Sequence, residues 1–181
     1  MLSAVLRWVE YPCGYVDRTM SESGTMKIRT LRFGELEVAE SDIIFMDEGL
    51  LGFPGLHKYA IIADPDQAPF IWLQSIEEPD LAFVVVDPFL FFPGYQLSLK
   101  PQELQTVNLE SIEQAVILTI VVIPLNPMDI TTNLRGPLII NPANNRARQL
   151  VLLDERYHTK HFLLRDIPPE LAGKPEEAVG E

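Results

Sequence analysis

From Met26 onward, short apolar runs alternate with turns that contain Gly, Pro, Asn or Asp. The runs are rich in β-branched and aromatic residues, so each predicts a β-strand. Many short strands with few helices favour an antiparallel sandwich or barrel over a doubly wound α/β sheet. The predicted strands are Ile28–Phe33, Leu36–Val38, Ile43–Met46, Tyr59–Ala63, Phe70–Ser75, Leu81–Val86, Gln96–Leu99, Ala115–Ile123, Leu138–Asn141, Gln149–Leu153 and Thr159–Leu164.

The pattern of apolar and polar residues within individual runs adds detail to this prediction. AFVVVD and VILTIVVI lack clean polar alternation, which is typical of strands covered on both faces, as in a closed sheet. PFIWLQS does alternate, and Ile76–Asp80 would turn the chain into the next strand. Gly34-Glu35 is a hairpin signal between the first two strands. The sequence therefore predicts a mainly β, single-domain, antiparallel barrel-like fold.

Helices are few in this pattern. Pro101–Val107 has Pro at the first helical position and Glu103 in the first turn, which favours a short helix. Leu109–Gln114 is a weaker second candidate. One or two short helices are thus expected beside the strands.

The ends of the chain differ from its centre. Residues 1–25 show no sustained period and end in the polar linker SESGT, so we expect an appended, poorly ordered extension or a mis-called start. An extra strand or helix built on Leu6, Trp8, Val9 and Tyr11 is the alternative. Residues 26–165 form the predicted β domain, and residues 166–181 predict a disordered acidic tail.

Composition and charge limit the function. The 181 residues carry a net charge of −12, which argues against direct nucleic-acid binding because phosphate contacts need clustered Lys and Arg. Between Glu35 and Asp129, sixteen acids face only Lys58 and Lys100, which suggests an acidic face suited to a basic partner. A single cysteine, Cys13, fits the reducing cytoplasm, and we expect neither a signal peptide nor a membrane span.

The sequence carries no recognised catalytic motif. The chain has no P-loop, GxGxxG, GxSxG or HExxH motif. His158 and His161 would share a face on a helix, but their neighbourhood YHTKHFLL is typical of a strand, on which they would point to opposite faces, and this disfavours a metal site. The acids of the Ile76–Asp80 turn predict a solvated turn rather than an acid–base pair. We therefore expect no enzyme, no metal and no cofactor.

Several segments together resemble a known family. They are GLLGFPGLHKY, PFIWLQS, PDLAFVVVDP, FLFFPGY, TTNLRGPLIIN and RARQLVLL, and their order and spacing are similar to those of the flagellar assembly factor (FliW) family. The resemblance covers about Met26 to Leu164 and leaves residues 1–25 outside. It implies a single-domain, barrel-like β fold with a short helix.

The resemblance also implies a function. Members of this family bind flagellin in the cytoplasm. When freed by flagellin export, they bind the small RNA-binding regulator CsrA and relieve its repression of flagellin synthesis, as non-competitive antagonists. A small β-barrel enzyme or ligand carrier is the competing hypothesis, and a deep polar pocket would favour it.

Two segments are candidate contact sites. The first is acidic and could repel RNA phosphates beside a basic surface, or could serve solubility alone; its residues are Glu77, Glu78, Asp80 and Asp87. The second is an apolar loop that could bind an apolar helix such as a flagellin terminus, or could instead cap the barrel as core; its residues include Phe89, Phe91 and Phe92. Asn133–Pro137 is interpreted as a turn.

Overall fold

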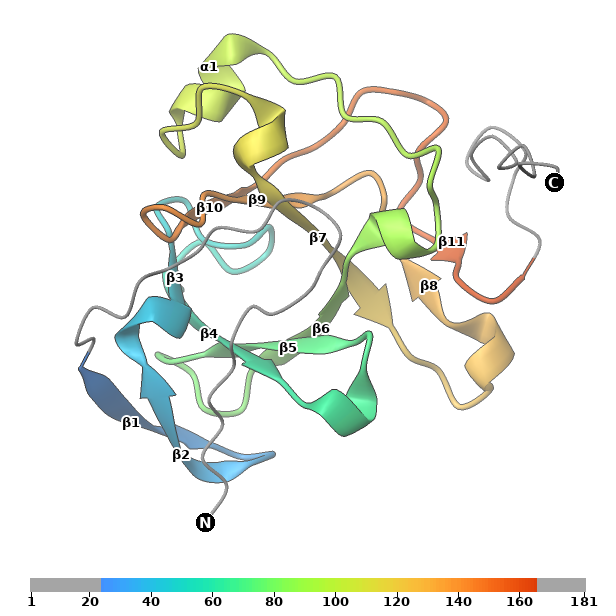
Figure 1. The fold of residues 1–181 in the computed structure, drawn as a ribbon. Helices are drawn as coiled ribbons and strands as arrows, with labels where there is room; N and C mark the ends of the chain where they lie inside the picture. Colours follow the sequence, from blue (N-terminus) through green and yellow to red (C-terminus); the bar gives the residue numbers. More distant parts are fainter. Residues whose placement is uncertain (1–23, 166–181) are drawn as a thin grey trace, which may run out of the picture.

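The computed structural model describes residues 24–165 (Figure 1), and the expectations for residues 1–23 and 166–181 lie outside this range. A nine-stranded sheet dominates the fold, and β7 pairs with β9 as well as with β6 and β8, which closes seven of the strands into a barrel. The barrel strands are β3 (Ile43–Met46), β4 (Lys58–Ala63), β5 (Ile71–Ser75), β6 (Ala82–Val86), β7 (Val116–Val122), β9 (Leu138–Ile140) and β10 (Arg146–Gln149).

Most of the strand pairs are antiparallel, as predicted. The exception is β10, which runs parallel to β3 with Arg146 opposite Phe45. Two short strands, β8 (Thr131–Thr132) and β11 (His161–Phe162), extend the sheet from the same edge of β7 that pairs with β9, but further along that strand. The long β7 makes this possible because its first half pairs with β9 and its last residues pair with β8.

The interior of the barrel is filled by apolar side chains. One buried cluster draws on all the barrel strands and contains Ile44, Met46, Leu50, Tyr59, Ile61, Ile71, Leu73, Val85, Leu118, Leu138, Ile140 and Ala147. A filled interior of this kind is a packed core rather than a ligand cavity. It therefore favours an interaction module over a carrier, the alternative that the sequence left open.

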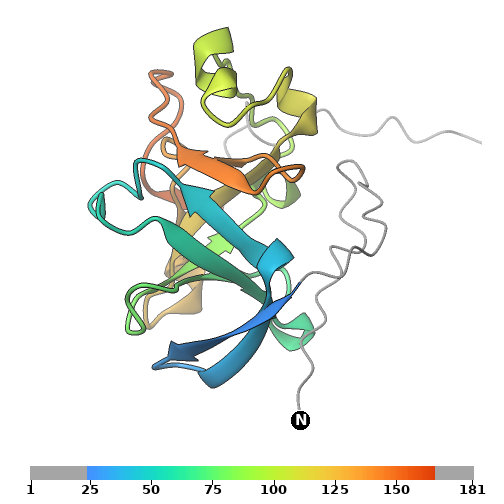
Figure 2. The same cartoon turned by 90° about the vertical axis from the view of Figure 1, so that its left-hand side faces the viewer.

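The outer faces of the same strands are also covered, which explains their missing alternation. The hairpin of β1 (Thr25–Thr30) and β2 (Gly34–Ala39) packs Ile28 and Val38 onto Ile62 and Trp72 of the barrel. Figure 2 shows this hairpin at one end of the molecule and α1 (Pro101–Gln105) at the other. The closed, doubly covered sheet that the apolar runs predicted is confirmed.

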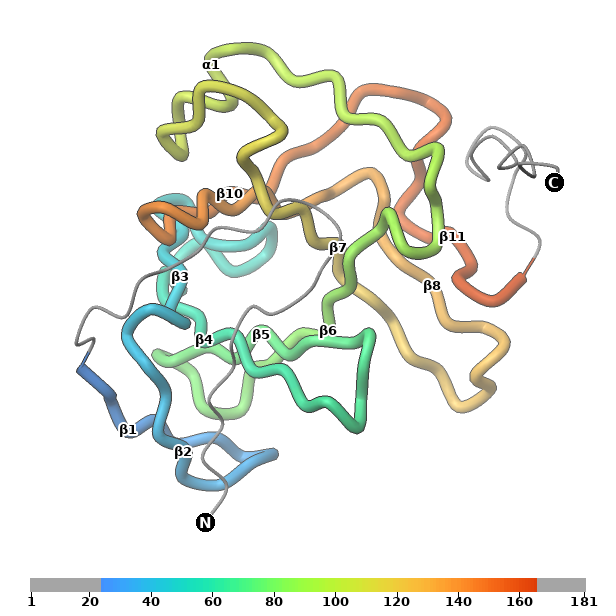
Figure 3. The backbone as a smooth tube through the Cα atoms, viewed as in Figure 1, coloured from blue at the N-terminus to red at the C-terminus, as the bar shows by residue number. Residues whose placement is uncertain are grey.

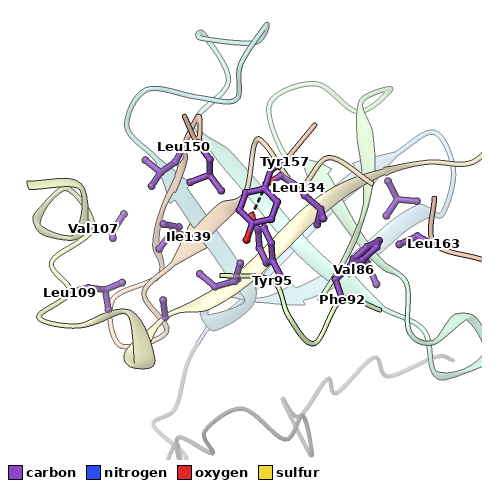
Figure 4. Packing of buried hydrophobic residues seen from close by; sticks show 14 of the residues in the cluster. Val86, Phe92, Tyr95, Val107, Leu109, Leu134, Ile139, Leu150, Tyr157 and Leu163 are labelled. Carbon is purple, nitrogen blue, oxygen red and sulfur yellow. Dashed lines mark hydrogen bonds between the residues drawn. The ribbon is translucent and has the colours of Figure 1, made fainter. Parts of the chain in front are cut away.

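A third cluster covers the remaining outer face. Figure 3 shows the segment after β6 running beside the segment before β11, and the two are joined by Tyr95 and Tyr157. Their rings meet edge to face at 4.8 Å, and the Tyr95 hydroxyl donates a hydrogen bond to the Leu134 carbonyl at 2.7 Å (Figure 4). The Tyr157 hydroxyl accepts the backbone N–H of Gln96 at 2.9 Å. These two tyrosines pin two distant loops together.

Some predicted strands are wrong in detail. Gln96–Leu99 forms no strand: Leu97 and Leu99 alternate toward the core, but the segment pairs with no strand of the sheet. The strand predicted at Gln149–Leu153 lies earlier, at β10, because Arg146 and Arg148 pair with Asp47 and Glu48 on the outside and hide the strand pattern. Thr159–Leu164 shrinks to the two residues of β11.

The first hairpin and the second predicted helix also depart from expectation, whereas the first predicted helix is present. Gly34 and Glu35 belong to β2, and the turn is Leu31–Phe33, which Gly34 follows with φ of +71°. The predicted helix is confirmed as α1, with the Glu103 carboxylate accepting the Lys100 N–H at 2.7 Å. In place of a second α-helix, Ile112–Gln114 forms a 3-10 turn. No helix within residues 24–165 is both long and apolar enough to cross a membrane.

Candidate functional site

The turn between β5 and β6 is built by side chains of β5. Gln74 is almost completely buried, and its Nε2 donates to the carbonyls of Ser75, Pro79 and Leu81 at 2.9 to 3.2 Å. The Ser75 hydroxyl accepts the backbone N–H of Glu78 at 3.0 Å. The Ile76–Asp80 turn predicted from the sequence is therefore confirmed, and buried polar side chains fix its backbone.

Glu77 has a structural partner within this turn. Its Oε2 accepts the backbone N–H groups of His57 and Lys58 at 2.6 and 2.9 Å, where β4 begins. His57 is half-buried, and its Nδ1 lies 3.0 Å from the Met46 carbonyl. Glu77 thus ties the acidic turn to the loop between β3 and β4, and its carboxylate is already engaged.

Glu78 and Asp80 differ from Glu77. Both are exposed, and their carboxylates make no hydrogen bond or ion pair with other residues in the described part of the chain. The β1–β2 turn lies beside them because the Leu31 N–H donates to the Pro79 carbonyl at 3.0 Å. Of the three acids predicted in the turn, these two are the ones available to a partner.

Asp87 lies in a separate place, after β6. Its Oδ1 accepts the backbone N–H of Phe89 at 2.8 Å and caps the 3-10 turn Pro88–Leu90. Burial raises the pKa of the Asp87 carboxyl, and the hydrogen bond from Phe89 opposes this shift in part. The residue is half-buried, so its carboxylate serves the local fold and does not extend the acidic surface of Glu78 and Asp80.

The aromatic loop is mostly part of the core. Phe92 has no exposed surface and packs in the cluster drawn in Figure 4. Phe89 and Phe91 are half-buried against the same cluster, and the Phe89 ring lies 5.7 Å from that of Tyr95. Leu90 is exposed, at 43%. The packing favours the core alternative that the sequence left open for this loop.

Six exposed apolar residues lie elsewhere, outside both candidate segments. They surround the β7–β8 connection and β11: Val122, Ile123, Leu125, Met128, Phe162 and Leu164. One signal was present in the sequence, because no charged residue occurs from Ala115 to Met128 even where Pro124, Asn126 and Pro127 mark a solvent-exposed turn.

The two histidines do not point to opposite faces, so that prediction is wrong. β11 begins at His161, while His158 lies in the loop before it, and the two rings stack with centroids 5.6 Å apart. The His158 backbone N–H donates to His161 Nε2 at 2.8 Å, which uses that nitrogen for structure. Among residues 24–165, no group of three or more His, Cys, Asp or Glu side chains is placed to hold a metal ion.

The fold and surface together define a class: a small closed β-barrel with a filled interior and a rigid acidic turn at its surface. Residues 27–163 match the family model described as FliW protein. The chain is 43% identical over 141 residues to the flagellar assembly factor FliW of Syntrophus aciditrophicus, covering 78% of this chain and 89% of that protein. It is 44% identical over 161 residues to that of Geotalea uraniireducens, covering 85% and 98%.

A solved structure agrees with these relatives. The crystal structure of the flagellar assembly factor FliW superposes with a TM-score of 0.72 at 30% identity, covering 78% of this chain and 99% of that one. The chain belongs to the FliW family, whose relatives named above are flagellar assembly factors. The resemblance inferred from the sequence motifs is confirmed.

Proposed function

We propose that this protein binds flagellin in the cytoplasm and, when free of it, binds the translational regulator CsrA and relieves repression of flagellin synthesis. Membership of the FliW family supports this partner switch. The observation that supports CsrA binding is the hydrogen-bonded turn between β5 and β6. This turn holds the unpaired carboxylates of Glu78 and Asp80 at the surface of an acidic chain. Such a turn suits a basic protein surface.

In this mechanism no covalent chemistry is required. Glu78 and Asp80 attract the basic partner, Glu77 and Gln74 hold the turn in place, and the net charge of −12 adds a repulsion toward RNA phosphates. Docking beside an RNA-binding face would thereby weaken RNA binding without covering that face.

The test is the affinity of CsrA for a Glu78→Gln/Asp80→Asn variant across ionic strength. We expect about tenfold weaker binding at low salt, equal to about 1.4 kcal/mol, and a shallower salt dependence. The control is Asp66→Asn/Glu110→Gln, which removes the same charge from exposed positions outside the turn; Asp66 lies at the opposite end of β5. If both variants weaken CsrA binding equally, the turn contributes only through the net charge of the protein and is not a specific contact.

The partner switch has its own test. Flagellin monomer added to a complex of this protein with CsrA should release CsrA in proportion to the flagellin bound. Formation of a stable ternary complex would contradict the switch while leaving both binding activities in place.

A further inference from the structure

The β7–β8 connection and β11 form the apolar edge, defined as Val122, Ile123, Leu125, Met128, Phe162 and Leu164. These side chains are between 39% and 105% exposed, and Leu125 at the tip is fully exposed. Figure 1 shows β8 and β11 at the side of the barrel away from the β1–β2 hairpin. Grouped large apolar side chains on a charged, soluble chain mark an interaction surface.

The strand register places part of this set on one face. Val122 pairs with Thr131, and Thr131 pairs with Phe162, so the three side chains lie in a row across β7, β8 and β11. The neighbouring row of Val121, Thr132 and His161 faces inward and is buried. One face of these strands therefore completes the core; on the other, Val122 and Phe162 are exposed, while Thr131 between them is buried.

β11 also offers backbone groups. It is the last strand of the sheet and pairs only with β8 among the described residues. The Leu163 N–H donates to the Ile130 carbonyl at 3.0 Å, so in the antiparallel alternation Phe162 turns its N–H and C=O away from β8. An extended segment can add to such an edge by backbone hydrogen bonds.

The charge of the apolar edge selects its partner. No charged residue occurs from Ala115 to Met128; of the charges that flank the apolar edge, Asp129 and Arg165 pair with each other, and the exposed Lys160 lies two residues before Phe162. The Arg165 guanidinium also lies over the Phe162 ring, 4.3 Å from its centroid. Apart from Lys160, the region is without net charge on a chain of net charge −12, and it suits an uncharged apolar segment as the Glu78–Asp80 turn suits a basic one.

We propose that the apolar edge is the docking surface for flagellin, and that an uncharged apolar segment of flagellin lies extended along β11 with its side chains on Val122, Leu125, Met128 and Phe162. This inference rests on the proposed function and relocates its flagellin contact from the Phe89–Phe92 loop. The two partners then contact different residues, so the release of CsrA expected of the partner switch requires that the bound proteins overlap in space beyond these contacts.

The test uses purified flagellin monomer and a Leu125→Ser/Met128→Ser variant. Both side chains are exposed, so the variant should melt as the wild type does. We expect at least about tenfold weaker flagellin binding, because two apolar contacts of about 1 kcal/mol or more are lost, with CsrA binding unchanged. The control Leu31→Ser removes a leucine that is 77% exposed on the β1–β2 turn, and it should bind flagellin normally.

A second measurement addresses the strand edge. Amide hydrogen exchange of Phe162 should slow at least about tenfold in the flagellin complex, as expected for a newly formed backbone hydrogen bond. Unchanged exchange, or equal flagellin affinity of wild type and the Leu125→Ser/Met128→Ser variant, would overturn this inference and leave the proposed function intact. Absence of flagellin binding by the wild type would overturn both.

Discussion

Glu77 accepts a hydrogen bond from the backbone N–H of His57 at 2.6 Å, across 20 residues of sequence. The same carboxylate oxygen accepts the Lys58 N–H, so one side chain fixes both the acidic turn and the start of β4. A residue that the sequence suggests as a contact is thereby a positioning residue, and its removal should act through the turn.

Glu77→Ala should lower the free energy of unfolding by about 1 to 2 kcal/mol, because two backbone donors lose their acceptor. Glu77→Gln keeps an acceptor oxygen and should lose about half as much. Urea unfolding of the two variants measures the difference. An alanine variant as stable as the wild type would show that these hydrogen bonds contribute nothing.

Phe92→Ala should destabilise the protein by about 3 to 5 kcal/mol, because it opens a cavity in a fully buried cluster. Leu90→Ala, two residues earlier and 43% exposed, is the matched control and should lose less than about 1 kcal/mol. Thermal melting compares the two. A small effect at Phe92 would reopen the binding-loop interpretation.

Asp87 should lower stability at neutral pH. Because burial raises its folded-state pKa above the unfolded value, the folded state binds more protons between the two values. The contribution of Asp87 to the free energy of unfolding therefore rises as pH falls through the folded pKa, and stays at its lowest level above it. Asp87→Asn retains an acceptor for the Phe89 N–H and removes this pH dependence.

The measurement is the difference in unfolding free energy between wild type and Asp87→Asn, from neutral pH to about pH 4, near the ordinary aspartate pKa. The asparagine variant should be the more stable at neutral pH, and its advantage should shrink on acidification. Asp87→Ala separates the two roles, because loss of the cap should cost about 1 kcal/mol. A pH-independent difference between wild type and Asp87→Asn would contradict the buried-carboxylate effect.

Tyr59 and Tyr95 are two buried tyrosines that differ in the hydrogen bonding of their hydroxyl groups. Burial, with a smaller contribution from Glu77, raises the pKa of Tyr59 to about 12, and its enclosed hydroxyl has no hydrogen-bond partner among the described residues. Tyr59→Phe should therefore be neutral or stabilising by up to about 1 kcal/mol. Tyr95→Phe orphans the Leu134 carbonyl and should cost about 1 to 2 kcal/mol. Denaturant unfolding distinguishes them; a larger loss at Tyr59 would mean that its hydroxyl has a partner.

Much of the barrel could be predicted because burial on both faces removes the polar alternation of its central strands. β6 and β7 are the clearest cases, since apolar runs lacking turn formers have few alternative structures. β10 could not be found in this way, because the two arginines that flank Ala147 are explained only by their ion pairs with the β3–β4 loop. Ion pairs between residues so far apart in the sequence cannot be recognised from the local sequence pattern.

The candidate sites were less predictable for a related reason. Composition identified an acidic turn, but only the structure separates the engaged carboxylate of Glu77 from the unpaired ones of Glu78 and Asp80. Similarly, the run from Phe89 to Phe92 and the residues around Leu125 are both apolar, yet one packs inward and the other faces solvent. Exposure of an apolar loop depends on what the rest of the chain places over it.

The parallel pairing of β3 with β10 has a kinetic consequence. Glu48 and Arg148, which meet beside this pair, are 100 residues apart along the chain, so the barrel closes only after both ends of the domain have been synthesised. Contacts of such long range slow folding, since loop-closure entropy is lost before packing compensates it. During translation, the apolar strands β4 to β7 therefore cannot complete the barrel until the last third of the domain has left the ribosome.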